Sequence, residues 1–237
     1  GSGLLLFPFP DPQDSVVGAY YVSESFSNYR FARRELIMLV RHALSETLKA
    51  FPDTTRLSLV DICQIDGVTP GYDVGAPRHP KTTHDKGGNI DIAYFQTDGA
   101  NDAQIICGDG SEHEDGWCSP AAAQTHIVDL PRQAYFMAKL YSSKRTRVIG
   151  VDEIIGPLLA KAAADLRDLP DDDPKKITAA EYQGFVSKMS YGSGWPYHHH
   201  HIHLSLQWWP KNAQEQSAPP ELSPPELSQA DPSAAEP

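Results

Sequence analysis

The segment 198–207 constrains the fold of this chain more than any other. It reads His-His-His-His-Ile-His-Leu-Ser-Leu-Gln, so polar and apolar side chains alternate from His201 onward. Because successive side chains of a strand point to opposite faces, this alternation predicts a strand with His201 and His203 on one face. Ile202 and Leu204 then point into a core. The run of four histidines resembles an affinity tag, but it is internal and continues directly into the strand.

A second polar pair lies upstream, where His84 precedes Asp91 by seven residues and two glycines form a turn between them. Asp91 lies in an apolar stretch, 90–95, that predicts another strand. Burying an isolated charge is very costly, so an aspartate buried there must be paired or bound to a metal. The residues leave a second interpretation open, in which Asp91 lies on a half-exposed face of the strand.

Together these segments supply a set of metal ligands. His84, Asp91 and His203 offer two imidazoles and one carboxylate, which suits a catalytic zinc ion with a fourth position for water. Zinc makes water acidic near neutral pH and polarises carbonyl groups. A base is then needed beside the water and off the metal, and His201 shares a strand face with His203. This set predicts hydrolysis of an amide, whereas the His-x-His pair alone also suits two solvated histidines.

The spacing of these residues resembles a known group of enzymes. The pair His84 and Asp91 with Gly87 between them, followed by the His-x-His of His201 and His203, is similar to the LAS group of zinc peptidases. That group includes the lysostaphin-type endopeptidases, the D-Ala-D-Ala metallopeptidases and the Hedgehog signalling domain.

A wider motif, His-x-x-His-x-His beginning at His198, resembles the penicillin-insensitive murein endopeptidases in particular. The likeness spans roughly residues 30–207 and includes the expected strand that begins at Arg147. The chain differs from that family at Lys81, where the family often has a further histidine. The acidic loop 98–120 is also longer than expected.

The resemblance implies a role for each of five residues. Zinc would be bound by His84, Asp91 and His203. The general base would be His201, and His198 would stabilise the transition state or support a ligand. The implied substrate is the peptide cross-link of peptidoglycan between D-Ala and meso-diaminopimelate. We therefore expect a periplasmic or secreted murein endopeptidase that contacts peptidoglycan stem peptides.

Two other functions stay open. A D,D- or L,D-carboxypeptidase of the same superfamily needs a cationic group for the terminal carboxylate, and three residues near the first ligand are candidates: Arg78, Lys81 and Lys86. A zinc-containing binding module without turnover, as in the Hedgehog domain, is the other alternative. His201 favours an enzyme, because a purely structural metal site needs no base off the metal.

The remaining histidines have weaker indications. His113 lies among acidic residues, which predicts a solvated side chain, and His126 precedes an apolar pair, which predicts a structural role. His42 lies in an expected helix and His79 lies beside proline; neither has a partner at ligand-like spacing. His199 and His200 flank the expected site. Four aromatic residues flank the last strand and suit a substrate groove or core packing: Trp195, Tyr197, Trp208 and Trp209.

Three cysteines bear on the compartment. Cys107 and Cys118 bracket a polar loop, and a disulfide between them would suit an oxidising compartment. Two free thiols are the alternative, because the sequence does not specify the geometry that a bridge requires. Cys63 has no recognisable partner and is not a credible nucleophile.

Hydrophobic periodicity predicts an α+β fold, because helices and strands do not alternate regularly. We expect one domain with a central, mostly antiparallel sheet flanked by helices, and with the zinc site on the sheet face. Helices are predicted over 29–51, 131–142, 152–169 and 178–189, and strands over 56–63, 90–95, 147–151 and 201–207.

The ends of the chain differ from its body. We expect residues 1–15 to form an N-terminal extension that starts with a cloning scar, and 16–210 to form the peptidase domain. Residues 211–237 are rich in Pro, Ala, Ser and Glu, which predicts a disordered tail.

The net charge is −11, and the body stays acidic without the five acids of the tail. This balance argues against a nucleic-acid partner and a polybasic membrane anchor, and no apolar run is long enough for membrane insertion.

Overall fold

The computed structural model of the 237-residue chain describes residues 5–9, 20–22, 28–71, 79–80, 83–106, 127–192, 194–195 and 197–207. The chain divides into the units Gly1–Gln207 and Trp208–Pro237, and every element described below belongs to the first. Several predictions fall outside the described residues, namely those for Arg78, Lys81, Cys107, His113, Cys118, His126, Trp208, Trp209 and the tail 211–237.

Four α-helices occur in the described residues: α1 (Arg34–Ala50), α2 (Leu130–Tyr141), α3 (Ile155–Arg167) and α4 (Ala179–Lys188). Local chemistry sets several of their starts. Asp129 accepts a hydrogen bond from Arg132 N at the start of α2, and Thr178 and Glu181 form a complete capping box at α4. No helix in these parts of the chain is long and apolar enough to cross a membrane.

Helix α1 begins five residues later than the hydrophobic spacing predicts. The preceding residues belong to a small antiparallel sheet, in which β3 (Phe31–Ala32) pairs with β1 (Phe7–Pro8). Their backbone is used elsewhere as well, because Phe31 N donates to Cys63 O and Ile62 N donates to Tyr29 O. Tertiary hydrogen bonds therefore override the local helical pattern at this point.

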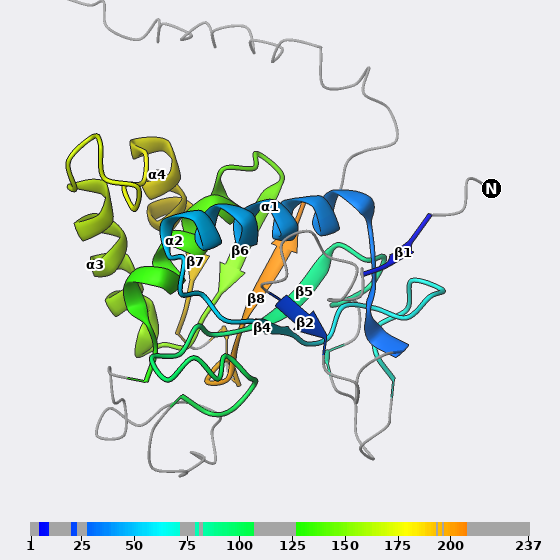
Figure 1. Ribbon diagram of the computed structural model, residues 1–237. Helices are drawn as coiled ribbons and strands as arrows, with labels where there is room; N and C mark the ends of the chain where they lie inside the picture. Colours follow the sequence, from blue (N-terminus) through cyan, green and yellow to red (C-terminus); the bar gives the residue numbers. More distant parts are fainter. Residues whose placement is uncertain are drawn as a thin grey trace, which may run out of the picture. The chain divides into compact units, whose positions relative to one another are not determined.

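Six strands form the main sheet: β2 (Tyr20–Val22), β4 (Leu57–Leu59), β5 (Asn89–Ala93), β6 (Thr146–Gly150), β7 (Met189–Ser190) and β8 (His201–Leu206). Their order is β2-β4-β5-β8-β6-β7. The three inner pairings are antiparallel, and the two outer pairings, β2 with β4 and β6 with β7, are parallel. Figure 1 shows β5 and β8 side by side. The predicted single α+β domain with a mostly antiparallel sheet is confirmed.

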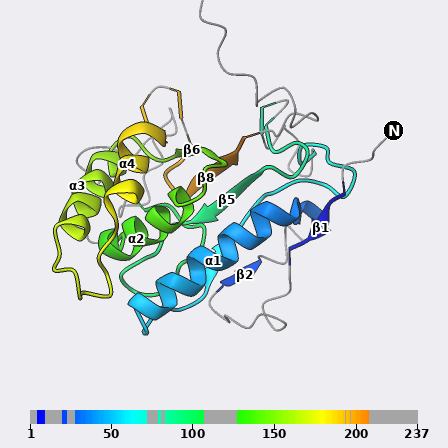
Figure 2. The ribbon, with the colours of Figure 1, turned by 90° about the horizontal axis from the view of Figure 1, so that it is seen from above.

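The core lies on one face of this sheet. Ile90 pairs with Leu204 and Ile92 pairs with Ile202 across the β5–β8 ladder, and all four side chains are fully buried. They join one apolar cluster with residues of all four helices. Figure 2 shows α1 and α2 next to each other in the helical layer. The alternation in the sequence therefore identifies the core face of β8 correctly, and it leaves the opposite face to the polar residues.

Candidate metal centre

The register of β5 and β8 brings Asp91 and His203 together. Asp91 lies directly opposite His203, and Ala93 lies opposite His201. Residues directly opposite in an antiparallel pair share a face of the sheet. His203 Nδ1 lies 2.9 Å from Asp91 Oδ1. Asp91 is only 1% exposed, so the half-exposed interpretation of this carboxylate is wrong and the paired, buried one is correct.

His84 enters the same cluster from the turn that precedes β5. Its backbone adopts φ 50°, in the left-handed region that few residues other than glycine adopt. Its Nδ1 lies 3.0 Å from Ile62 O. Because a carbonyl can only accept, Nδ1 carries the hydrogen. Nε2 then carries none, and its lone pair is available to coordinate a cation. This Nε2 lies 3.0 Å from His203 Nδ1 and 3.2 Å from Asp91 Oδ1.

The turn itself depends on Gly87, which adopts φ 65°. A Cβ at this position would lie 2.9 Å from Arg33 N and 3.0 Å from Ala32 Cα. The first contact is closer than real Cβ atoms approach and the second is tighter than most, and both neighbours are backbone atoms, so glycine suits this passage against the chain before α1. That close passage sets where the chain enters β5 and hence where His84 lies.

Three donor atoms therefore converge, with separations of 2.9, 3.0 and 3.2 Å between His203 Nδ1, His84 Nε2 and Asp91 Oδ1. Ligand atoms about 2.0–2.2 Å from a tetrahedral zinc ion lie about 3.3–3.6 Å from one another. The observed triangle is slightly tighter than that, and it would need to open by only a few tenths of an ångström. The donor set and its spacing thus fit a divalent metal ion.

His79 is a further member of the cluster, which the sequence analysis missed. The ligand atoms of His79, His84 and Asp91 lie within 4.8 Å of one another, so this group too could hold a metal ion. The rings of His79 and His84 stack with centroids 3.9 Å apart, and His79 Nε2 lies 2.8 Å from Asp61 Oδ2. The only sequence signal was its position five residues before His84, because a loop beside proline has no periodicity to interpret.

The expected base and its neighbour also lie at this face. His201 Nε2 is 3.5 Å from Asp91 Oδ2, and its buried Nδ1 has no hydrogen-bond partner among the described residues. The ring of His198 lies 4.9 Å from that of His201 and 6.1 Å from that of His203. The structure thus brings together all five residues that were expected to form the site.

Burial and mutual contact control the charges in the cluster. Burial lowers the pKa of His84 and that of His201, although the neighbouring Asp91 opposes this effect, so both imidazoles favour the neutral form. Burial by itself would raise the pKa of Asp91. The neighbouring His201 and His84, any positive charge on which a carboxylate would stabilise, and the hydrogen bond with His203 Nδ1 outweigh it and hold that pKa well below its ordinary value. Neutral imidazoles beside a carboxylate are the protonation states that bind a cation.

Two aromatic residues position the segment that carries His198. Gly150 lies opposite His203 on β6, and a side chain there would collide with the indole of Trp195. Trp195 O accepts a hydrogen bond from His198 Nδ1 at 3.1 Å, so the indole and the imidazole are placed together. From the core side, Tyr94 donates its hydroxyl hydrogen to His198 O at 2.9 Å.

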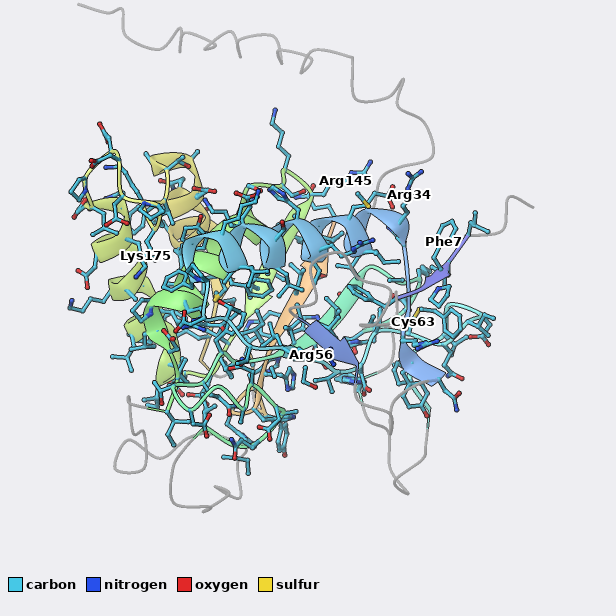
Figure 3. All side chains as sticks on the ribbon, in the orientation of Figure 1. Phe7, Arg34, Arg56, Cys63, Arg145 and Lys175 are labelled. Carbon is cyan, nitrogen blue, oxygen red and sulfur yellow. The ribbon has the colours of Figure 1, made fainter. Side chains whose placement is uncertain are left out.

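Three further residues considered in the sequence analysis lie in the described part of the chain. Lys86 Nζ lies 3.4 Å from Asp85 Oδ2. His42 lies within α1, as expected. Cys63, labelled in Figure 3, is buried, and burial raises the pKa of its thiol to about 12, which agrees with its exclusion as a nucleophile.

Comparison with known proteins does not assign the chain to a family. No protein-family model matches the chain, and no curated protein matches it significantly. What the structure shows is a buried group of histidines and an aspartate on a mixed sheet that could bind a metal ion, as in a metalloenzyme.

Proposed function

We propose that the chain is a zinc-dependent peptidoglycan hydrolase that cleaves the peptide cross-link between D-Ala and meso-diaminopimelate. The observation that carries the proposal is the convergence of His84 Nε2, His203 Nδ1 and Asp91 Oδ1 within 3.2 Å of one another. Two imidazoles and one carboxylate form a catalytic rather than a structural zinc set, because structural sites are usually closed by four protein ligands.

A backbone group already orients one of the proposed zinc ligands. Ile62 O holds the tautomer of His84 that presents Nε2 to the cluster. Such an outer partner fixes the ring of a ligand and raises its basicity. Zinc, when bound here, supplies a Lewis acid that polarises a carbonyl and makes water reactive at neutral pH.

His201 is the proposed general base. Burial favours its neutral form, which is able to take up a proton. Asp91 Oδ2, at 3.5 Å from His201 Nε2, would stabilise the imidazolium that results. His198, oriented by Trp195 O, is proposed to stabilise the negative charge that develops on the substrate carbonyl oxygen; with Nδ1–H bound to Trp195 O, it would donate from Nε2 in its doubly protonated form.

The choice of substrate rests on the resemblance of this motif to the murein endopeptidases, together with the amide chemistry of the site. Peptidoglycan lies outside the cytoplasm, so we propose a periplasmic or secreted location. The acidic net charge of −11 agrees with a peptide substrate rather than a nucleic acid. His201 beside the ligands favours an enzyme over a zinc-containing binding module.

The test is digestion of purified peptidoglycan by the full chain after zinc loading, with the released peptides identified by mass. We expect cross-linked dimers to disappear and monomers to accumulate, and a chelator to stop the reaction. Loss of single terminal D-Ala residues without loss of dimers would show a carboxypeptidase instead. A chain that holds zinc and leaves all these peptides intact would overturn the proposal.

A further inference from the structure

A guanidinium group lies farther along the face that carries the candidate ligands. Ser205 shares that face of β8 with His201 and His203, because it lies four residues beyond His201 and two beyond His203. Arg147 of β6 donates to Ser205 Oγ from Nη2 at 2.9 Å and from Nε at 3.2 Å. Two hydrogen bonds from one guanidinium fix the plane and direction of the group.

An irregularity in the sheet puts Arg147 in this position. Thr146 pairs with Leu206 and Val148 pairs with Ser205, so the register shifts at Arg147, which has no opposite residue on β8. One extra residue in a strand re-aims the side chains around it, and such bulges are common next to active sites. The shift turns Arg147 toward the polar face instead of leaving it in regular alternation.

The charge of Arg147 is not neutralised by the residues described. Its side chain is exposed, and within the described ranges its only polar partner is the neutral hydroxyl of Ser205. Its neighbour Arg145 differs, because Arg145 Nη1 lies 2.9 Å from Glu35 Oε1. A guanidinium stays charged at every physiological pH and presents a planar fork that matches a carboxylate.

The spacing along β8 between His203 and Ser205 suits a substrate group next to the scissile bond. Ser205 follows His203 by two residues, or about 6.8 Å along a strand. In the substrate considered, the scissile nitrogen is bonded to a carbon that carries a carboxyl group. The carbon of that carboxyl group lies at most about 4 Å from the scissile carbonyl carbon. With a hydrogen bond of about 2.9 Å added, this length is similar to the two-residue step from His203 to Ser205, the residue that Arg147 contacts.

We propose that Arg147, oriented by Ser205, binds a free carboxylate on the carbon attached to the scissile nitrogen of the substrate. This inference rests on the proposed peptidase function and specifies its substrate class. Meso-diaminopimelate in a cross-link carries such a carboxylate, and so does a terminal D-Ala. The shared chemistry is the carboxylate, and the two sources are separated by the test.

The test uses two pairs of peptides, one cross-linked through D-Ala and meso-diaminopimelate and one ending in D-Ala-D-Ala. In each pair the carboxyl group beside the scissile nitrogen is either free or a carboxamide. We expect the zinc-loaded chain to cleave the free acid of one pair with a kcat/KM about tenfold or more above that of its amide, the size of a charge-assisted hydrogen bond. The pair that is cleaved identifies the source of the carboxylate.

Arg147→Gln should remove that preference by slowing cleavage of the free acid, with little change for the amide. Arg145→Gln is the matched control, because it removes an arginine two residues away, labelled in Figure 3, whose partner is Glu35. Arg145→Gln should keep the preference. A wild-type chain that cleaves acid and amide equally, or an Arg147→Gln chain that keeps the preference, would overturn the inference.

A binding measurement separates this inference from the proposed function. Calorimetric titration of the full chain without added metal, with the free-acid and amide peptides, reports on Arg147 without turnover. We expect Arg147→Gln to weaken binding of the free acid about tenfold and to leave the amide unchanged. If no peptide is cleaved but this difference is found, the proposed hydrolysis fails and the carboxylate site stands. If cleavage occurs without the difference, only the carboxylate site fails.

Discussion

Asp91 and His203 face each other across the β5–β8 ladder, with Oδ1 of the aspartate 2.9 Å from Nδ1 of the histidine. The pairing register decides this contact. If β5 slipped by one residue along β8, each polar residue of one strand would lie opposite a core residue of the other. Buried apolar pairs on the other face, such as Ile92 with Ile202, hold that register. The packing of the core therefore positions the candidate metal ligands.

Asp91→Asn should remove metal binding while conserving the shape of the side chain. The change replaces a buried carboxylate by a neutral amide between imidazoles, so the cluster loses the negative charge that attracts a cation. We expect about one zinc per wild-type chain and only a small fraction of that in the variant, measured by elemental analysis after dialysis. Asp85→Asn, next to His84 in the sequence, should retain wild-type zinc. Full zinc in Asp91→Asn would exclude this centre.

His201→Ala should separate hydrolysis from metal binding. Loss of a general base lowers turnover by about 10²- to 10⁴-fold, while the proposed ligands are unchanged. The measurement is the initial rate of cross-link cleavage together with the zinc content of the same sample. His42→Ala, in α1, should alter neither quantity. If His201→Ala loses its zinc, His201 is a ligand and not the base.

His79→Ala should weaken zinc binding without abolishing it. His79 stacks on His84 and lies 2.8 Å from Asp61 Oδ2, so it supports a proposed ligand from outside the main triangle. Loss of such a supporting residue typically lowers metal affinity by about 10- to 100-fold. Competition with a chelator of known affinity measures the change, and His203→Ala is the reference for loss of a direct ligand. Equal losses in the two variants would make His79 a ligand itself.

Gly150→Ala should destabilise the fold and disturb Trp195. A Cβ at Gly150 would overlap the indole ring, and such overpacking costs about 1–3 kcal/mol of unfolding free energy. Urea titration followed by tryptophan fluorescence reports both effects. Gly194→Ala is the matched control, because no described atom lies within 4 Å of a Cβ built at Gly194. Unchanged stability and fluorescence in Gly150→Ala would contradict the described contact.

Cys63 should resist alkylation in the folded chain. Burial raises the pKa of its thiol to about 12, so below that pH the thiol keeps its proton and the thiolate is scarce. At pH 8 a thiol of this pKa is only about one ten-thousandth ionised. Iodoacetamide treatment followed by mass analysis of the Cys63 peptide should show modification only after denaturation in urea. Rapid modification of the native chain would show that the thiol is accessible.

The sequence by itself determined the features that depend on near neighbours. Alternation over His201 to Leu206 identified the polar and core faces of β8, because side-chain direction in a strand has a period of two residues. Thr178 and Glu181 identified the start of α4, because a capping box is made within four residues. The chemistry of the candidate ligands was also evident, since residue type alone decides which atoms can bind a metal.

Only the tertiary structure decided how these residues meet. Asp91 and His203 are 112 residues apart, and their contact depends on a register that buried side chains hold from the other face of the sheet. His79 reaches the cluster by stacking on a ring that a glycine turn has placed, and Arg147 faces the polar side because of a shift in pairing. Neither feature has a periodic signal, because both arise from contacts between segments that are distant in the chain.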